Sequence, residues 1–231
     1  MKALILQSNY IPWKGYFDLI NMADVFIIYD EVQYTKNDWR NRNKIKTANG
    51  LTWLTIPVKQ EKLSQRIIDT RVHNNEWRKK HWNSIKLSYT KAPFFKRYSD
   101  VFEALYLQTT EINLSTINHS FIVAINEILG ISTKIVWSQD FSLIEGKTER
   151  LVDLCRKVGA DEYISGPAAK GYLETQKFAD QEIKVAWMSY DDYPEYSQLY
   201  PPFEHGVSIL DLIFNEGTNS TVFMKSFNSN K

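Results

Sequence analysis

The sequence predicts an α/β fold with a mainly parallel sheet flanked by helices. Residues 2–6 and 25–29 are short apolar runs with the length and β-branched content of buried strands. Between them lie a turn and a segment with Phe17, Ile20 and Asn21 at helical spacing. A strand, a helix and a second strand at this spacing form a parallel pair. The expected architecture is a single Rossmann-like domain over residues 1–231, with a helical insert near residues 76–130.

The middle of the chain carries the predicted insert. Residues 36–50 have the composition of a polar loop that ends in the turn signal Asn49-Gly50. Strands are predicted over 51–58, where Pro57 indicates a sheet edge, and over 66–72. Amphipathic periodicity predicts helices over 76–91, 99–109 and 114–129, and Gly130 ends the last of them.

The C-terminal part returns to alternating strands and helices. Strands are predicted over 131–137, 161–165 and 183–188. A helix is predicted over 148–158, closed by Gly159, and residues 208–215 form a short apolar segment. This alternation at both ends of the chain favours the α/β class.

Composition excludes several other classes of protein. The chain is 43% hydrophobic and contains 7 Trp, 13 Tyr and 12 Phe, enough apolar area to stabilise a folded core. Its one cysteine, Cys155, excludes an intrachain disulfide framework and a Cys-rich zinc site. No apolar run reaches the roughly 18 residues of a membrane-spanning helix, and the N-terminus lacks a signal-peptide core, so we expect a cytoplasmic protein.

The near-neutral net charge of +1 conceals an asymmetry. Residues 1–100 hold 18 Lys and Arg against 9 Asp and Glu, a net of +9, and residues 101–231 have a net of −8. A basic first half favours an anionic ligand there, such as a phosphate or a nucleotide. The alternative is that the two halves pack together and their charges offset.

The turn after the first strand is the first candidate binding segment. Tyr10, Trp13 and Tyr16 recur every third residue, with Gln7 and Asn9 beside them. Aromatic faces and amide groups suit a sugar or a nucleobase, and ligands of α/β sheets bind at the carboxyl ends of strands. The alternative is that these rings anchor the first helix to the sheet.

The segment that follows the second strand is the second candidate. Residues 36–46 hold five basic residues against one acid, interleaved with Trp39. Arg42 can bind a phosphate through two hydrogen bonds. Basic, aromatic and amide residues also describe a nucleic-acid-binding loop, but no nucleic-acid fold signature accompanies them and we do not expect that partner. A solvated loop is the remaining alternative.

Two further segments suggest chemistry. Seven basic residues and no acid lie between Trp77 and Arg97, and positive charge around His81 would keep that imidazole neutral and able to accept a proton. The alternative is a buried structural histidine.

After the strand at 161–165, the turn Ser165-Gly166 with Lys170 can hold an anion through backbone N–H groups and the lysine charge. No His, Asp and Glu cluster has the spacing of a metal site, and Cys155 has the position of a packing residue.

Taken together, these segments resemble the WbqC-like protein family. The matching motifs cover nearly the whole chain and comprise Gln7, Tyr10, Pro12, Trp13, Gly15, Tyr16 and Phe17, then Ala23-Asp24, Val32 to Lys36, Trp39, Asn41, Arg42, Ile45 and Lys46, then Lys80-His81, Tyr89, Lys91 to Pro93, Ser165-Gly166, and Ser208 to Asn215. Ser8 departs from the pattern, because the family commonly has proline there.

The resemblance implies a transferase of surface-polysaccharide (O-antigen) biosynthesis. Such a protein would attach an amino acid or acyl group to the amine of a nucleotide-linked amino sugar, using ATP or an acyl-carrier-linked donor. On this hypothesis the catalytic residues are His81, Asp30 and Lys36. The substrate-binding residues are Gln7, Asn9, Tyr10, Trp13, Gln33, Trp39, Asn41, Arg42, Lys46, Ser165, Gly166 and Lys170. Two alternatives stay open: an ATP-using, adenylate-forming nucleotidyltransferase-like enzyme, suggested by fold analogy alone, and a non-catalytic nucleotide- or nucleic-acid-binding module.

Overall fold

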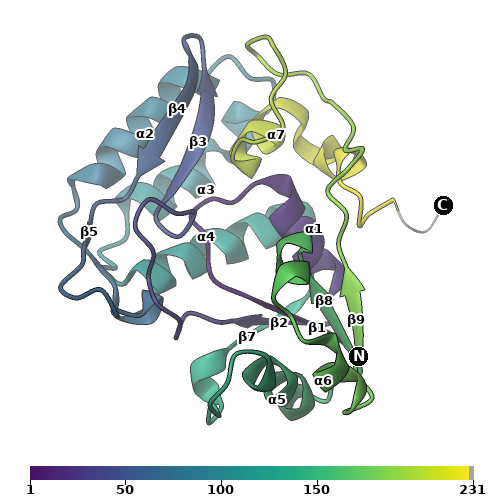
Figure 1. Cartoon of the computed structure of the whole chain (residues 1–231). Coiled ribbons are helices and arrows are strands. Elements are labelled where there is room, and N and C mark those ends of the chain that lie inside the picture. The colour runs from purple at the N-terminus through teal and green to yellow at the C-terminus, as the bar shows by residue number, and fades with distance from the viewer. Residues whose placement is uncertain (229–231) are drawn as a thin grey trace.

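A five-stranded parallel sheet forms the centre of the protein (Figure 1). The computed structural model describes residues 1–228. The strands lie in the order β7 (Lys134–Trp137), β2 (Val25–Ile28), β1 (Lys2–Leu6), β8 (Glu162–Ser165) and β9 (Lys184–Trp187). Each neighbouring pair is parallel. The predicted α/β class and Rossmann-like sheet are therefore confirmed.

Alternate residues of the central strands pack on opposite faces of the sheet. Leu4, Phe26 and Ile28 join one apolar cluster. Ile5 and Ile27 join another. Because both faces are covered, these strands are apolar along their whole length, which is why the sequence shows them as continuous runs.

Different helices cover the two faces (Figure 1). On one face lie α1 (Lys14–Met22) and α4 (Leu114–Leu129). On the other lie α5 (Thr148–Val158) and α6 (Thr175–Ala179). The predicted bounds of α4 and α5 are correct, because the left-handed glycines Gly130 and Gly159 end these helices.

The insert between β2 and β7 contains helices and two small hairpins. The helices are α2 (Glu76–Tyr89) and α3 (Phe95–Leu107), followed by α4. The first hairpin joins β3 (Arg42–Thr47) to β4 (Gly50–Thr55), and the second joins β5 (Val58–Lys59) to β6 (Arg71–Val72). Near the C-terminus, α7 (Ile209–Glu216) packs beside this insert.

Three sequence predictions in the insert are wrong. The polar loop over 36–50 contains strand β3, whose buried positions include the polar residues Asn43 and Lys46, so no apolar alternation marks it. Residues 66–72 form mainly the 3₁₀ helix η1 (Ile67–Asp69), with only two residues in β6. Helix α3 begins at Phe95, four residues before the predicted start.

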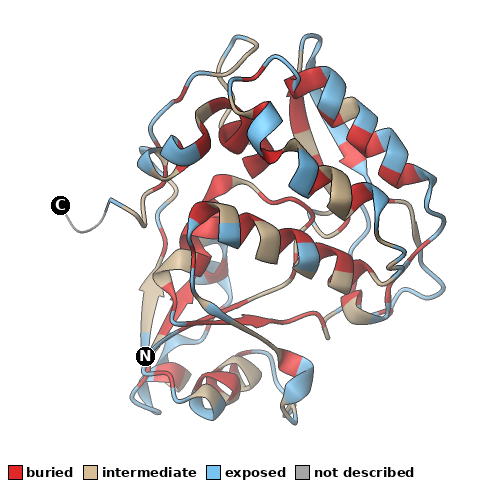
Figure 2. Ribbon diagram, turned by 180° about the vertical axis from the view of Figure 1, so that it is seen from behind, coloured by how far each residue is buried: buried red, intermediate tan, exposed pale blue. Residues whose placement is uncertain are grey.

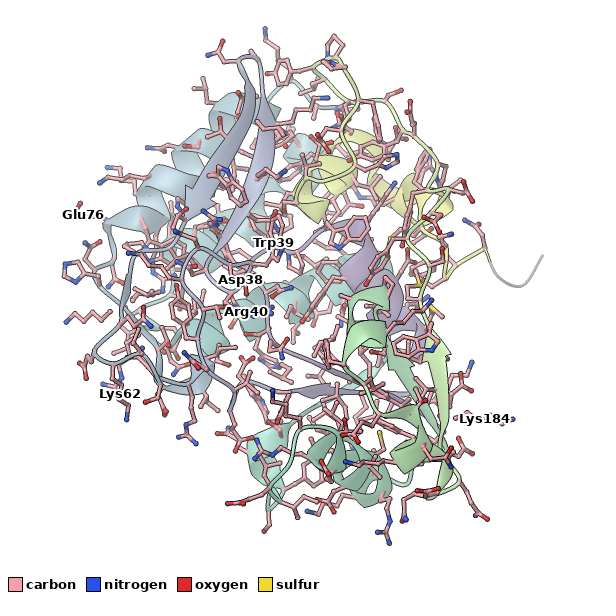
Figure 3. All side chains as sticks on the ribbon, viewed as in Figure 1. Asp38, Trp39, Arg40, Lys62, Glu76 and Lys184 are labelled. Atoms are coloured by element: carbon pink, nitrogen blue, oxygen red, sulfur yellow. The ribbon has the colours of Figure 1, made fainter. Side chains whose placement is uncertain are left out.

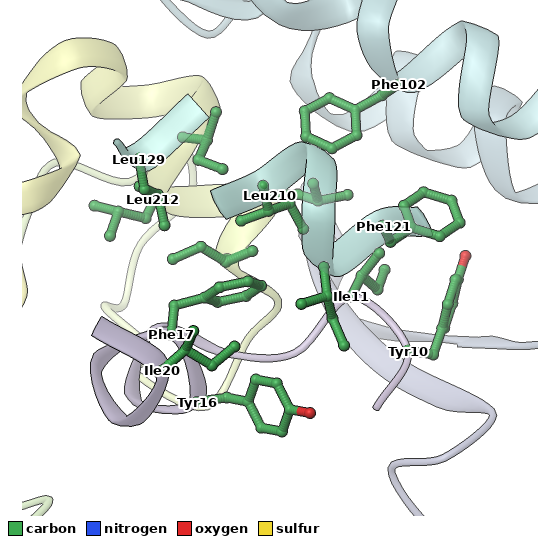
Figure 4. Close-up of a cluster of buried hydrophobic side chains, with 14 of the residues drawn as sticks. Tyr10, Ile11, Tyr16, Phe17, Ile20, Phe102, Phe121, Leu129, Leu210 and Leu212 are labelled. Carbon is green, nitrogen blue, oxygen red and sulfur yellow. The ribbon is translucent and has the colours of Figure 1, made fainter. Parts of the chain in front are cut away.

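The larger apolar cluster joins the sheet to the insert. It includes Tyr10, Ile11 and Phe17 from the N-terminal segment, Phe121 from α4 and Leu210 from α7 (Figure 4). The sheet, the helices of the insert and α7 all contain buried residues (Figure 2). Within residues 1–228, no helix is both long enough and apolar enough to cross a membrane.

Candidate functional site: a cleft at the switch point of the sheet

A cleft of about 740 Å³ opens where the strand order reverses. From β1 the chain first builds β2 and β7 on one side, and then β8 and β9 on the other. The loops that leave β1 and β8 therefore diverge, and ligands of open α/β sheets bind in the crevice between such loops. Gln7 and Asn9 line the cleft from the β1 side, and Ser165 and Gly166 line it from the β8 side.

A buried carboxylate holds the β1–α1 turn in place. Asp30, just after β2, accepts hydrogen bonds from the Ser8 backbone N–H at 2.8 Å and the Ser8 hydroxyl at 2.6 Å, and a third from the Ser115 hydroxyl. Burial raises the pKa of Asp30, and these hydrogen bonds oppose the rise. The Asn118 side chain also donates to the Ser8 hydroxyl, at 3.1 Å. This network fixes the backbone on either side of Gln7 and Asn9.

The same turn contains a strained residue. Ile11 has φ of +37°, a region that a β-branched residue rarely occupies, and it is fully buried. The Asn43 amide donates to the Tyr10 and Ile11 carbonyl oxygens at 3.2 and 2.9 Å, and the Tyr10 N–H donates to the Trp39 carbonyl at 3.0 Å. Hairpin and loop residues thus stabilise an unusual turn, and such strain is commonest at functional sites.

Arg40 supplies a cation to the cleft. Its guanidinium donates to the Asn9 side-chain oxygen and, at 3.2 Å, to the Gln7 side-chain oxygen. Both acceptors are neutral, and the Asp38 carboxylate lies 3.8 Å away. The Arg40 Nε is buried and has no hydrogen-bond partner within residues 1–228. The charge is therefore positioned by amides and only partly compensated. Asp38, Trp39 and Arg40 lie along one loop in Figure 3.

Aromatic side chains form much of the remaining wall. The Trp13 ring lies 5.0 Å from Tyr190 and 5.5 Å from Tyr193, centroid to centroid. Trp39 is 43% exposed at the rim, where its ring lies 5.5 Å from that of Trp53. An exposed Trp beside a cleft is a common ligand-binding surface, because its face is apolar and its N–H can donate.

The charge of the cleft has one sign. Arg40 and Lys147 line it, and none of its lining residues within the described chain is Asp, Glu, His or Cys. Two cations without a carboxylate favour an anionic ligand. At Gly166, a Cβ atom would approach the Tyr190 hydroxyl to 3.3 Å, so this glycine allows the two walls to come close.

Six of the predicted site residues meet in this cleft, and these are Gln7, Asn9, Trp13, Trp39, Ser165 and Gly166. Five of them lie in the loops that follow β1, β2 and β8, and Ser165 is the last residue of β8. Their placement agrees with the rule that ligands of α/β sheets bind at the carboxyl ends of the strands.

Other predicted site residues are buried elsewhere. His81 is 6% exposed in α2, with its Nδ1 2.8 Å from the Tyr10 hydroxyl, which in turn lies 2.5 Å from the Tyr106 hydroxyl. Desolvation lowers the pKa of His81 to about 4. Neither His81 nor Tyr10 lines the cleft, and Asp30 acts on the turn from within the protein.

Two of the buried residues belong to the β3 region. Asn41 donates to the Ile56 carbonyl at 2.8 Å. The Lys46 ammonium donates to the Gln198 side-chain oxygen at 2.6 Å and to the Pro202 carbonyl. Both side chains connect segments of the fold, and neither lines the cleft.

Four predicted residues lie outside the cleft, and of these Arg42 is half-buried and the others are exposed. Lys36 and Lys170 are exposed, and Lys170 lies over the Trp187 ring at 5.7 Å. Gln33 donates to the Leu63 carbonyl at 2.7 Å. Arg42 lies 4.2 Å from the centroid of the Trp53 ring. These four residues also do not line the cleft.

Sequence reasoning missed Arg40, Lys147 and Tyr190, which line the cleft. Arg40 lies between Trp39 and Asn41 in a loop where five basic residues look equivalent in sequence. The two arginines differ in secondary structure. Arg42 begins β3 and packs against Trp53 of the same hairpin, whereas Arg40 lies in the loop before that strand. Lys147 precedes α5 and Tyr190 follows β9, so both also obey the strand-end rule.

The cleft offers no set of ligands for a metal ion. Throughout residues 1–228, no group of three or more His, Cys, Asp and Glu side chains is placed to hold one. Its polar groups are instead amides, hydroxyls and two cations, which suit phosphate or carboxylate oxygens.

Comparison with known proteins agrees with the sequence motifs. A protein of Mycobacterium tuberculosis (strain ATCC 25618 / H37Rv), named as uncharacterized protein Rv1507c, is 46% identical over 225 residues, which cover 97% of each chain. No solved structure matches the chain. The model of the WbqC-like protein family matches residues 7–223, from the first residue of the β1–α1 turn to the end of the last 3₁₀ helix. Because that match spans nearly the whole chain, including both loops that form the cleft, the chain belongs to the WbqC-like protein family.

Proposed function

We propose that the protein is a cytoplasmic transferase of surface-polysaccharide biosynthesis. It binds a nucleotide-linked amino sugar in the switch-point cleft and joins an acyl or aminoacyl group to the sugar amine. The observation that carries the proposal is the cleft itself. It has two cations, no lining carboxylate within residues 1–228, and walls of aromatic rings at the place where α/β sheets bind nucleotides.

Each part of a nucleotide-linked sugar has a matching feature in the cleft. The diphosphate carries the negative charge that Arg40 and Lys147 attract, and a guanidinium can bond two phosphate oxygens at once. The faces of Trp13, Trp39 and Tyr190 suit a base or a sugar ring. The volume of about 740 Å³ lies within the range of small-molecule sites, roughly 300–1,000 Å³.

The cleft contributes to transfer mainly by positioning. His81 and Asp30 are buried away from it, and Lys36 is exposed outside it, so we assign none of the three a contact with substrate. Binding the diphosphate rigidly would orient the sugar amine toward an acyl donor, which lowers the entropic part of the barrier. The donor is an activated acyl group, supplied on a carrier or formed with ATP.

Isothermal titration calorimetry tests the proposal. The wild-type protein is titrated with a nucleoside, with the matching nucleoside diphosphate and with a nucleotide-linked 4-amino sugar, for the uridine and thymidine series. We expect affinity to rise in that order, and transfer of an acyl group to the amine to be detectable by mass spectrometry. Absence of binding to every diphosphate and sugar nucleotide would refute the proposal.

The strand order favours a second candidate, an ATP-using, adenylate-forming enzyme. The order β7-β2-β1-β8-β9 is 3-2-1-4-5 in chain sequence, the order of the first five strands of dinucleotide-binding folds. The glycine-rich phosphate turn of those folds is missing, since residues 7–15 hold one glycine, Gly15. Exchange of pyrophosphate into ATP, with amino acids present, would favour this candidate, and lack of exchange would count against it.

A further inference from the structure

A second, smaller pocket continues from the cleft. It has a volume of about 320 Å³, and Asn9, Trp13 and Trp39 line both cavities. Its far side is formed by His205 and Gly206, in the loop before α7. The cleft and the pocket therefore meet at the two indoles, with the cation Arg40 on the cleft side and an imidazole on the other.

The lining of this pocket suits an uncharged ring. Within the described chain, none of its lining residues is Lys, Arg, Asp or Glu. Its walls combine the indoles of Trp13 and Trp39 with Pro12 and the amide of Asn9. Flat apolar faces with a few hydrogen-bonding groups recognise a sugar ring, which has apolar faces and a polar rim. A phosphate would find no cation among the described residues that line this pocket.

We propose that this pocket is the subsite for the sugar ring of a nucleotide-linked amino sugar, and that His205 accepts the proton from the sugar amine. This inference rests on the proposed function, because it requires the diphosphate to lie beside Arg40 in the adjoining cleft. Because Asn9, Trp13 and Trp39 line both cavities, one ligand can occupy both.

His205 has the surroundings of a base. It lines the pocket, and its ring packs edge-on against Phe203 with the ring centroids 4.6 Å apart. Its Nδ1 is buried and makes no hydrogen bond within residues 1–228, so we assign Nε2 as the nitrogen that meets the ligand. Burial and the Lys14 ammonium lower the pKa of His205, whereas Glu195 and Glu204 raise it in part. The imidazole is therefore neutral at pH 7 and able to take a proton.

The transfer step balances with a thioester as donor. The amine nitrogen attacks the thioester carbonyl carbon, so an N–C bond forms and the C–S bond breaks with its electron pair on sulfur. His205 takes the proton that the nitrogen loses and passes it to the departing thiolate, which leaves as a thiol. The imidazole returns to its neutral form, and no oxidation or reduction occurs.

The first experiment separates the subsite from the cleft. Affinities for UDP and for a UDP-linked 4-amino sugar are measured by calorimetry on the wild type and on Gly206→Leu, which adds a bulky side chain at a residue that lines the pocket. A Cβ at Gly206 would lie 3.0 Å from Glu204 Oε1 and 3.7 Å from Lys44 Nζ, so the Glu204 side chain, which accepts the Gly206 N–H at 2.7 Å, must shift slightly. Thermal unfolding of the variant shows whether the fold is kept. We expect the wild type to bind the sugar nucleotide about tenfold more tightly than UDP, a gain of about 1.4 kcal/mol. In Gly206→Leu the affinity for the sugar nucleotide should fall to about that for UDP, while the affinity for UDP stays within about twofold of the wild-type value.

The second experiment tests His205 with the same acceptor and a thioester donor. In His205→Gln we expect kcat to fall by about 10²-fold to 10⁴-fold with KM within about threefold, and the acidic limb of the kcat profile to disappear. His119→Gln is the matched control, because His119 packs against Trp137 and lines neither cavity.

The possible failures are distinguishable. Two results would overturn the inference and leave the proposed function standing. One is that Gly206→Leu binds UDP and keeps the wild-type preference for the sugar nucleotide over UDP. The other is full activity in His205→Gln. Absence of binding to both UDP and the sugar nucleotide in the wild type would overturn both.

Discussion

Replacing Arg40 by Gln should weaken diphosphate binding with little loss of stability. Arg40 is the cleft cation held by Gln7 and Asn9, and its side chain is 16% exposed. Gln retains part of the aliphatic stem and an amide but removes the charge. The nucleoside lacks the phosphates, so its affinity should change by less than about twofold.

The size of the effect follows from the hydrogen bonds lost. A hydrogen bond to a charged group contributes about 1.5–3 kcal/mol. At about 1.4 kcal/mol per factor of ten, affinity for a nucleoside diphosphate should fall by about 10-fold to 150-fold. Folding should suffer less, because the nearest carboxylate lies 3.8 Å from the guanidinium and both amide acceptors line the open cleft. We expect a loss of at most about 2 kcal/mol.

Calorimetry at one fixed salt concentration measures the affinities, and thermal unfolding measures the stability. Arg42→Gln is the matched control, because Arg42 lies two residues further along the chain, at the start of β3, and packs over Trp53 outside the cleft. Equal losses of diphosphate affinity in Arg40→Gln and Arg42→Gln would show that general surface charge binds the ligand. Unchanged affinity in Arg40→Gln would refute the assignment of Arg40.

Four further predictions concern the framework of the site. Asp30→Ala should destabilise the protein by about 3 kcal/mol or more in urea titrations, because three buried donors lose their acceptor; a loss below about 1 kcal/mol would contradict this role. His81 has a folded pKa of about 4, below its unfolded value of 6.5, so its contribution to stability is complete above pH 6.5 and is lost toward pH 4. The wild type should therefore lose about 3 kcal/mol more than His81→Phe over that range, and equal losses would argue against a buried neutral imidazole. Gly15→Ala should lower the free energy of unfolding by about 1–3 kcal/mol, because the new Cβ would collide with the Trp13 ring. An unchanged free energy of unfolding would show that the Trp13 ring does not lie against Gly15. Burial raises the pKa of the Cys155 thiol to about 12, so a thiol reagent at pH 8 should modify it only after unfolding, and fast labelling of the folded protein would contradict its position.

The sheet could be predicted because its signals are local. Strands buried on both faces are continuous apolar runs, and left-handed glycines such as Gly130 and Gly159 mark helix ends. Strand β3 could not be predicted in this way. Its buried Asn43 and Lys46 are polar, and their hydrogen-bond partners lie far away in the sequence, at Ile11 and Gln198. Contacts between residues far apart in the sequence stabilise this strand, and such contacts leave no local sequence pattern.

The candidate site, like the fold, could be predicted from the sequence only where its signals are local. Gln7 and Ser165 follow from the position of their strands in a parallel sheet. Which arginine of the basic loop enters the cleft depends on the place where β3 begins, and the role of His81 depends on packing against Tyr10 and Tyr106. A histidine among many basic residues has the same local sequence whether it is catalytic or buried. Only the fold separates the two.

A crystal structure of the protein soaked with a nucleotide-linked 4-amino sugar tests the central claim most directly. We expect the diphosphate within hydrogen-bonding distance of the Arg40 guanidinium and the sugar ring between Trp13 and Trp39. A ligand bound outside the switch-point cleft, or a cleft that stays empty at saturating ligand, would contradict it.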